Sequence, residues 1–434
     1  MAESVEKGVA KLVERTWTPA DLTGLPRRDR QGCRYSAYIP DRLVGRELFL
    51  SGTTAADVSD AEAALAGFDN QVSSLVDTEA LARLLLRAEA VASSHIEGLV
   101  VGGRRLLRAE AAGALGETAV DVTTAEVLGN IDAMNFAIQQ LAGAVTIEGI
   151  LEIHRLLLAS TPQKHLAGRL RDAQNWIGGS SYNPCSAAFV PPPEGDVEDL
   201  MADLCAFIND DTLSPVAQAA VVHAQFETIH PFVDGNGRTG RALVHVVLRR
   251  RGLTTKAVPP ISLILATRAE DYVAGLTSFR YLGSPDQPAA VDGVNHWIST
   301  FAAATTRAAV DAGDFEERID ALKATWRDRL GGVRAGSATA ELVERLPGTP
   351  IVTVQGVAEM LGRSVTSIGE AIDRFAEAGI LTQITTGRRN RAWEASEVVD
   401  AFTDFERALA SPTGGTSSAK PARPVPARRQ RKKP

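Results

Sequence analysis

The segment from His230 to Arg241 constrains the fold of this chain more than any other, because sequences with helical periodicity lie on both sides of it. The residues that recur on one helix face before it are Val216, Ala219, Ala220, His223, Phe226 and Ile229. This spacing predicts a buried helix that ends near His230. A second helix is predicted from Arg238 to Arg251, stopped by Gly252. The sequence therefore predicts a helix, a tight loop and another helix.

The loop between these two helices has the composition of an anion site. Gly235 and Gly237, on either side of Asn236, can adopt positive φ and let the backbone approach a ligand. The free N–H groups at the start of the second helix and its dipole favour a negative charge there. Arg238 and Arg241 are three residues apart, so both can reach one phosphate chain.

Two residues beside the loop have side chains suited to reaction chemistry. Asp234 could hold Mg²⁺, which binds through one or two carboxylates plus substrate phosphates. His230 titrates near neutral pH and could take a proton from an attacking hydroxyl. Taken singly, each of these residues is more often structural or solvated. Together they suit phosphoryl or nucleotidyl transfer, which depends mainly on positioning and charge neutralisation.

The whole segment resembles the Fic family signature, His-x-Phe-x-(Asp/Glu)-Gly-Asn-Gly-Arg-x-x-Arg, and every specified position is filled. The resemblance implies a protein adenylyltransferase that moves AMP from ATP to a Ser, Thr or Tyr hydroxyl of a target protein, or of the chain itself. It implies that His230 is the general base, that Asp234 binds Mg²⁺ and that Phe232 anchors the loop. The residues from Gly235 to Arg238 would cradle the phosphates, and Arg241 would meet the γ-phosphate.

Two other segments are similar to parts of the same family. Short strands are predicted at 176–179 and 188–190, and the stretch 171–193 is similar to the family's flap, a β-hairpin that can hold a target segment as an added strand. A plain surface hairpin explains that pattern equally well. Tyr272 lies in a segment similar to one that helps to line the adenine pocket, although it could as easily be a core residue.

The hexapeptide from Ser93 to Gly98 is similar to the family's inhibitory motif, (Ser/Thr)-x-x-x-Glu-(Gly/Asn). Ser93 and Glu97 are four residues apart, so they share one helix face. The resemblance implies that Glu97 pairs with Arg241 and occupies the place of the γ-phosphate. In some relatives the same glutamate positions water to remove AMP. From the residues alone, Glu97 could also be a solvated acid before a helix stop.

The C-terminal part predicts a separate small unit. Residues 353–362 and 364–379 predict a helix-turn-helix, and residues 380–393 predict a two-stranded wing, a pattern that resembles a winged helix-turn-helix. The residues that would contact DNA are Arg363, Ser364, Thr366 and Ser367 at the start of the recognition helix and Arg388, Arg389 and Arg391 in the wing. Acidic residues on the later turns of that helix make dimerisation or partner docking an equal alternative.

The predicted fold is mainly α, a Fic-type helical bundle with a β-hairpin flap followed by a small winged-helix domain. The regions expected are an irregular N-terminal segment (1–57), an N-terminal helical region with the inhibitory motif (58–160), the Fic catalytic core (161–330), the winged helix-turn-helix (339–409) and a disordered basic tail (411–434). The tail carries seven Lys or Arg and no acid, so a net charge of −7 leaves −14 on the rest of the chain. That body as a whole would not attract nucleic acid.

Several classes of protein are disfavoured. No signal peptide or membrane-spanning run is recognisable, so a cytoplasmic protein with no membrane contact is expected. Cys33, Cys185 and Cys205 are scattered and odd in number, so neither a zinc site nor a disulfide framework is predicted. The Walker P-loop and the dinucleotide-binding fingerprint are absent.

Three functions stay open from the sequence. The leading one is an ATP-dependent protein adenylyltransferase inhibited by Glu97, and the others are a de-AMPylase or bifunctional enzyme that uses Glu97 and a nucleotide-sensing DNA-binding regulator. The signature contacts phosphates, so transfer of UMP, GMP or phosphocholine fits it as well. A homodimer is compatible with each.

Overall fold

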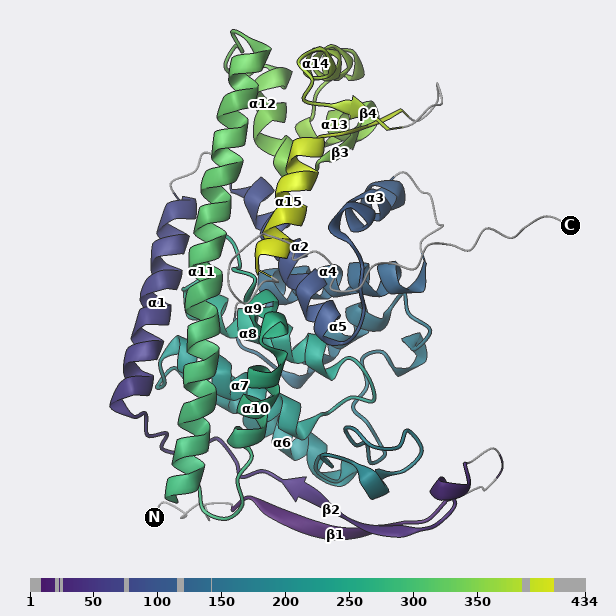
Figure 1. Ribbon diagram of the computed structural model, residues 1–434, viewed down its shortest axis with the longest axis vertical. Coiled ribbons are helices and arrows are strands. Elements are labelled where there is room, and N and C mark those ends of the chain that lie inside the picture. The colour runs from purple at the N-terminus through teal and green to yellow at the C-terminus, as the bar shows by residue number, and fades with distance from the viewer. Residues whose placement is uncertain are drawn as a thin grey trace, which may run out of the picture.

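The computed structural model describes residues 9–19, 23, 26–73, 78–114, 121–141, 143–384 and 391–409, and it is mainly helical, as predicted (Figure 1). The helices of the body are α1 (Gly52–Ser73), α2 (Glu79–Ile96), α3 (Gly103–Ala114), α4 (Val122–Gln140), α5 (Ile147–Leu158), α6 (Val197–Ile208), α7 (Pro215–Ile229), α8 (Asn236–Arg250), α9 (Ile261–Thr267), α10 (Ala269–Phe279) and α11 (Pro288–Leu330). None of the described helices is both long and apolar enough to cross a membrane.

The 43-residue helix α11 runs almost the whole height of the molecule (Figure 1). Near its start it packs against α1, α7 and α10, and near its end against the C-terminal helices α12 (Ala338–Arg345) and α15 (Ser396–Leu409). Its two buried tryptophans show this double role. The indole N–H of Trp297 donates to the Ala220 carbonyl of α7 at 2.7 Å, and that of Trp326 donates to Glu397 of α15 at 2.7 Å. One helix therefore places side chains in the cores of both parts.

The N-terminal region contains a β-hairpin, so the prediction that residues 1–57 are irregular is wrong there. Strand β1 (Lys11–Trp17) pairs antiparallel with β2 (Cys33–Ile39), with Lys11 opposite Ile39 and Trp17 opposite Cys33. Every residue of β1 is exposed or only partly buried. A strand with no fully buried face carries no regular alternation of apolar and polar residues, so its sequence lacks the signal of a strand.

A disulfide joins this hairpin to the flap, so the prediction that no cysteines pair is also wrong. Cys33 bonds Cys185 with the two Cα atoms 5.8 Å apart, across 152 residues of sequence. Cys185 lies in a short 3₁₀ turn (Pro184–Ser186) between the two halves of the flap. Cys205 is a buried free thiol. Spacing along the chain could not reveal a pair that only the tertiary fold brings together.

The flap contains less β-structure than predicted. Ile177 and Phe189 form a single antiparallel bridge, in which Ile177 N donates to Phe189 O at 2.8 Å, and no ladder extends from it within the described residues 171–193. The N-terminal hairpin supports the flap from the other side, since Tyr38 N donates to Val190 O at 2.9 Å. The flap is thus bound to the N-terminal hairpin, an element that the sequence did not predict.

The C-terminal unit contains the helices and the strand pair expected there. Its elements are α12, β3 (Ile351–Thr353), α13 (Val354–Leu361), α14 (Val365–Glu377), β4 (Thr382–Gln383), β5 (Ala392–Glu394) and α15. The three strands form an antiparallel sheet in the order β3-β5-β4. Residues 385–390, with Arg388 and Arg389, and the predicted disordered tail from 411 to 434 lie outside the described residues.

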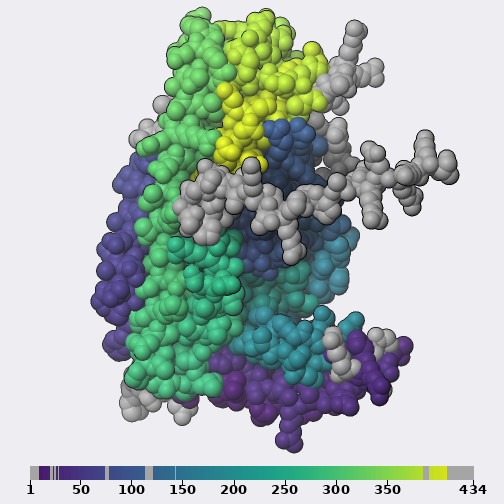
Figure 2. Space-filling view, viewed as in Figure 1, coloured from purple at the N-terminus to yellow at the C-terminus, as the bar shows by residue number. Residues whose placement is uncertain are grey.

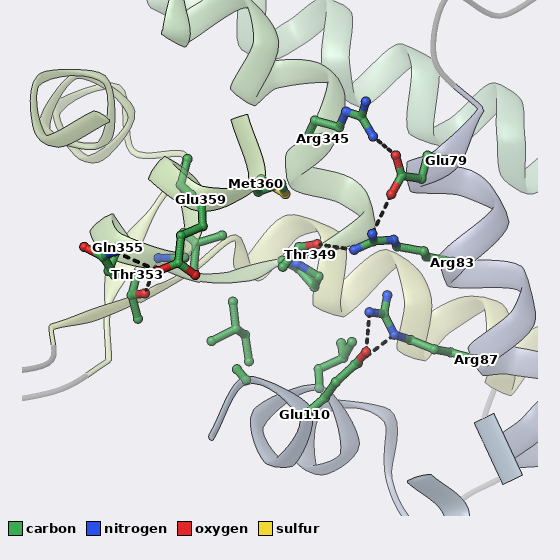
Figure 3. Close-up of a pocket in the computed structure, with 17 residues that line it drawn as sticks. Glu79, Arg83, Arg87, Glu110, Arg345, Thr349, Thr353, Gln355, Glu359 and Met360 are labelled. Carbon is green, nitrogen blue, oxygen red and sulfur yellow. Dashed lines mark hydrogen bonds and ion pairs between the residues drawn. The ribbon is translucent and has the colours of Figure 1, made fainter. Parts of the chain in front are cut away.

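This unit packs directly on α2 and α3, and Figure 2 shows it continuous with the helical body. Arg87 of α2 donates to the carbonyl of Gly348 at 2.7 Å, and a Cβ at Gly348 would lie 2.5 Å from the Cα of Ala80. Glycine is therefore required for this close approach. A cleft of about 590 Å³ remains between α2, α3, β3 and α13, lined in part by the Arg87–Glu110 ion pair (Figure 3).

Candidate active site

The loop between α7 and α8 begins at His230, whose backbone is left-handed with φ 50° and ψ 60°. It is the only non-glycine residue with positive φ in the described part of the chain. Such a conformation costs roughly 1–3 kcal/mol and persists only where neighbours enforce it. Here the His230 carbonyl accepts hydrogen bonds from Arg171 Nε at 2.9 Å and Asn175 Nδ2 at 3.2 Å. The flap residues therefore fix the direction in which the imidazole leaves the chain.

The middle of the loop is locked by one amide side chain. Asn236 Oδ1 accepts from Phe232 N at 2.8 Å, and its Nδ2 donates to Phe232 O at 2.9 Å. The ring of Phe232 is fully buried and stacks on His154, with ring centroids 3.7 Å apart. His154 in turn contacts the Asp234 carbonyl at 3.0 Å. These contacts explain why the loop needs a phenylalanine and an asparagine at those positions.

The start of α8 presents unsatisfied donors at one place. Gly235 precedes the helix with φ 78°, and its Cβ, were it present, would lie 2.9 Å from Leu157. Arg238 is 4% exposed, yet its Nε and Nη1 have no hydrogen-bond partner. Buried donors without partners are costly, and a helix N-terminus favours an anion. The arrangement is that of a binding site for phosphate groups.

Arg241, one turn further along α8, is already paired. Its Nε donates to Ser93 Oγ at 2.9 Å, and its Nη2 donates to Ser93 O at 2.7 Å and to Glu97 Oε1 at 2.8 Å. A Cβ on Gly237 would lie only 1.9 Å from Glu97 Oε1, so this carboxylate sits against the first turn of α8. The contact between Glu97 and Arg241 that the sequence predicts is present.

The charges of this pair reinforce one another. Burial acts to raise the pKa of Glu97, but the guanidinium of Arg241 outweighs it and holds that pKa below its usual value. Burial acts to lower the pKa of Arg241, and the Glu97 carboxylate raises it instead. Both groups are therefore charged at neutral pH. The Glu97 carboxylate fills the position beside Arg241 that a bound phosphate would need.

His230 is prepared to accept a proton. Burial and the guanidinium groups of Arg280 and Arg171 together lower its pKa to about 4. Its Nδ1 is buried without a hydrogen-bond partner and lies 3.7 Å from Glu227 Oε2. Burial also raises the pKa of Glu227 to about 7, against the opposing effect of Arg241. At neutral pH the imidazole is therefore uncharged and available as a base.

Asp234 is an accessible carboxylate at the edge of the loop. Its Oδ1 accepts from Gly235 N at 2.7 Å, its side chain is 47% exposed, and Arg238 Nη2 lies 3.7 Å from it. No group of three or more His, Cys, Asp or Glu that could hold a metal occurs in the described residues. A single accessible carboxylate beside a phosphate site nevertheless fits Mg²⁺, which takes its other ligands from phosphates and water.

Two family models match the region that holds this site. Residues 144–248 match the Fic/DOC family, and residues 55–139 match the Fic/DOC family N-terminal region. These two regions of the chain therefore resemble a Fic/DOC domain and the region that precedes it. The first match contains α7, the loop and α8 up to Leu248, and the second contains α2 together with Glu97, which follows it.

Curated Fic relatives resemble the chain over this region. The protein adenylyltransferase fic-1 of Caenorhabditis elegans is 35% identical over 133 residues, which is 30% of this chain and 23% of the relative. The protein adenylyltransferase Fic of Drosophila melanogaster is 36% identical over 139 residues, or 31% of this chain and 26% of the relative. The chain thus spans about a quarter of the length of the curated relatives it matches.

One solved structure shares the fold over a larger part of the chain than these relatives do. A Fic family protein from Desulfovibrio desulfuricans G20 has a TM-score of 0.50 at 19% identity, covering 80% of this chain and 98% of that one. At this identity the likeness concerns the fold alone. It agrees with the predicted fold class, a mainly helical Fic-type architecture.

The structure brings most of the predicted site residues together. Around the start of α8 lie His230, Asp234, Gly235, Asn236, Gly237, Arg238, Arg241, Ser93 and Glu97. Tyr272 of α10 is buried, and its hydroxyl lies 2.7 Å from His223 Nε2. Its contact with adenine stays a prediction.

The predicted DNA contacts lie apart from this site, in the C-terminal unit. Ser364 caps α14 by accepting from Ser367 N at 3.3 Å, and Thr366 is exposed on the first turn. Arg363 is paired with Glu341 at 2.5 Å, and Arg391 lies over the ring of Trp393. Arg363 is therefore already neutralised within the unit.

Sequence reasoning assigned no role to Glu227 or to Arg280, both of which face His230. Glu227 is three residues before His230 on the same helix, and that spacing was a usable signal. Arg171 was noted only as part of the flap, whereas its guanidinium also donates to Pro192 O at 2.5 Å and so ties both halves of the flap to the loop. Only the tertiary fold could reveal that function.

Proposed function

We propose that this chain is an ATP-dependent protein adenylyltransferase, which transfers AMP to a hydroxyl side chain of a target protein. The observation that carries the proposal is the buried guanidinium of Arg238, without partners on Nε and Nη1, at the start of α8 and beside an uncharged His230. Phosphate groups would satisfy those donors, and the base would then lie next to a bound phosphate chain. The names of the curated relatives support the same activity.

The reaction uses the residues as follows. The hydroxyl oxygen of the target attacks the α-phosphorus of ATP, its proton passes to the imidazole of His230, and the bond to pyrophosphate breaks. The left-handed backbone at His230 and its bonds to Arg171 and Asn175 keep the imidazole aimed at the site. Arg238 and the N–H groups of α8 stabilise the charge on the phosphates. AMP remains on the target, and pyrophosphate leaves.

Asp234 would hold Mg²⁺ in this enzyme. Its accessible carboxylate lies at the edge of the phosphate site, and its Oδ1 is oriented by Gly235 N. When bound, Mg²⁺ neutralises phosphate charge during transfer. The protein's own part is to orient that carboxylate beside the loop.

Labelled ATP tests this activity. In the Glu97→Gly protein we expect protein-bound label with ATP labelled at the α-phosphate, none with ATP labelled at the γ-phosphate, and none in either case with EDTA. Asp234→Asn should raise the Mg²⁺ concentration needed for half-maximal labelling, whereas Asp172→Asn, a change of an exposed aspartate, should not. Transfer of the γ-label would contradict the proposal and indicate a kinase. Competition by unlabelled UTP or GTP would identify a different nucleotide.

Glu97 would keep this enzyme inactive in the form seen in the structure. Its carboxylate pairs with Arg241 and contacts the first turn of α8, where the γ-phosphate of ATP would lie. ATP would then bind only in a pose unsuited to transfer. The pair is partly exposed, with the Glu97 side chain 37% accessible, so displacement by a ligand needs little rearrangement.

The reverse reaction is the nearest alternative. Glu97 is ionised and accessible beside the phosphate site, so it could orient water against a bound AMP ester. The two proposals differ in their response to Glu97→Gly: forward labelling rises if Glu97 inhibits, and release of AMP from a pre-labelled protein falls if Glu97 positions water. A bifunctional enzyme shows both changes.

The C-terminal unit supports a second candidate function, DNA binding by a winged helix. The order of α13, α14 and the β4–β5 pair matches that module, and the first turn of α14 is exposed at Thr366. If this holds, a gel-shift assay should give an affinity that falls steeply with salt, and Thr366→Glu should weaken it. Binding that does not depend on salt would exclude this mode and favour protein docking.

A further inference from the structure

We propose that Glu89, buried two helical turns before Glu97, is the positioning residue that sets the register of α2 against α8 and so places Glu97 on Arg241. This inference rests on the proposed inhibition by Glu97. It goes beyond the inhibitory motif, which begins at Ser93.

Three polar contacts join α2 to α8 at four-residue steps. Glu89 lies 2.8 Å from His245 Nε2, Ser93 accepts from Arg241 Nε at 2.9 Å, and Glu97 accepts from Arg241 Nη2 at 2.8 Å. As the residue numbers rise along α2, those of the contacted residues on α8 fall, so the two helices run antiparallel here. Because residues four apart share a helix face, these contacts form one continuous line.

The Glu89 contact is as enclosed as the Ser93 contact and more enclosed than the Glu97 contact. The side chains of Glu89 and His245 are each 1% exposed, and the Glu97 side chain is 37% exposed. Glu89 also accepts from Ser262 N at 2.8 Å and from Ser262 Oγ, at the start of α9. His245 Nε2 itself makes no hydrogen bond, so it faces the Glu89 carboxylate as a close polar contact, and the hydrogen bonds of Glu89 are those from Ser262. Glu89 therefore joins α2 to α8 and α9 at once.

These contacts define the position of α2 along its own axis. A slide of α2 by one residue moves every side chain by about 1.5 Å along the axis and rotates it away from its partner. Such a slide would break three contacts at Glu89, all in a water-excluded place where unpaired polar groups are costly. At Glu97 only the carboxylate side of the contact is open to solvent, because Arg241 is 2% exposed, so a phosphate could approach and replace the carboxylate there. The buried carboxylate thus fixes the position, and the exposed one acts at the nucleotide site.

Ser93 shares this role through the two hydrogen bonds that it accepts from Arg241, whereas the remaining contacts of α2 do not. Asn130 of α4 donates to Ala90 O at 2.9 Å and to Ser94 Oγ at 3.1 Å, which orients a neighbouring face of the helix. Arg87 joins α2 to the C-terminal unit through Gly348. Neither contact reaches α8, so neither fixes the register between the helices that carry Glu97 and Arg241.

The test uses the full-length chain in two backgrounds, with Glu97 and with Glu97→Gly. Glu89→Gln and the milder Ser262→Ala are made in each, with His95→Ala, an exposed change on the same helix, as the matched control. In the Glu97 background we expect Glu89→Gln and Ser262→Ala each to raise self-labelling by about five-fold or more. In the Glu97→Gly background the same variants should not raise self-labelling further, because the contact between Glu97 and Arg241 that they displace is already absent.

Hydrogen exchange gives a readout that does not depend on transfer. Amides of residues 93–97 should lose protection in Glu89→Gln and Ser262→Ala, while those of α7 keep theirs. A purely structural role would instead lower labelling by the same factor in both backgrounds and reduce protection across the core. Unchanged labelling and unchanged exchange in a folded variant would overturn the inference. Absence of labelling in Glu97→Gly alone would show instead that the proposed function fails.

Discussion

Replacement of Glu97 by glycine is expected to raise self-labelling by α-labelled ATP about ten-fold or more. The change removes the carboxylate that pairs with Arg241 at 2.8 Å and frees the first turn of α8. Glu97 caps the C-terminal end of α2 with φ −85°, ahead of Gly98, so glycine does not break a helix interior there. The rate of label incorporation into the purified protein measures the effect.

Glu97→Gln is the matched control, because it keeps the size of the side chain and removes its charge. We expect an intermediate rate, since an amide can still contact Arg241 but cannot pair with it as a carboxylate does. The double variant Glu97→Gly with His230→Asn should give no label. A Glu97→Gly protein that binds ATP and labels no faster than the parent would contradict inhibition by this residue.

Thermal unfolding gives a second measure of the same change. Without Glu97, the buried guanidinium of Arg241 keeps its Ser93 contacts but loses its carboxylate partner, and an incompletely paired buried charge destabilises the fold. The midpoint of unfolding should therefore fall in the absence of nucleotide. ATP should raise it more in Glu97→Gly than in the parent, because the phosphates then replace the lost carboxylate.

The sequence predicted the helices and the core of the site because their signals are local. The end of α7, the Gly-Asn-Gly turn and the start of α8 lie within one short segment, and the residues that bind the phosphates follow from helix spacing. The contact of Glu97 with Arg241 is not local, and it became predictable only through resemblance to a family. The physical reason for Asn236, which bridges the two backbone groups of Phe232, required coordinates.

What the sequence did not predict depends on contacts between distant segments. The Cys33–Cys185 bond spans 152 residues, and β1 lacks the alternation that would identify a strand. Glu227 and Arg280 modulate His230 from α7 and from the end of α10, and no spacing rule connects Arg280 to that histidine. Glu89 is four residues before Ser93, yet its partners His245 and Ser262 come from two other helices.

His230→Asn should lower the transfer rate in the Glu97→Gly background by about 10²–10⁴-fold, the usual contribution of a general base, while ATP binding is retained. Asparagine tolerates the left-handed backbone that His230 adopts, so the loop should keep its shape. Its amide cannot take a proton from the attacking hydroxyl. Labelling and the affinity for a non-hydrolysable ATP analogue, measured side by side, separate chemistry from binding. His165→Ala, a change of an exposed histidine, is the control and should alter neither.

The pH dependence of the Glu97→Gly enzyme follows from the same histidine. Its pKa of about 4 means that the imidazole is already unprotonated at pH 6, so raising the pH from 6 to 8 should bring no gain from this group. Activity should fall only as the pH approaches 4, when protonation removes the base. The negative charge of Glu97 acts to raise the pKa of His230, so its removal moves this limit to still lower pH. A transfer rate that instead rises ten-fold between pH 6 and 7 would mean that a different group, with a pKa near or above neutrality, accepts the proton.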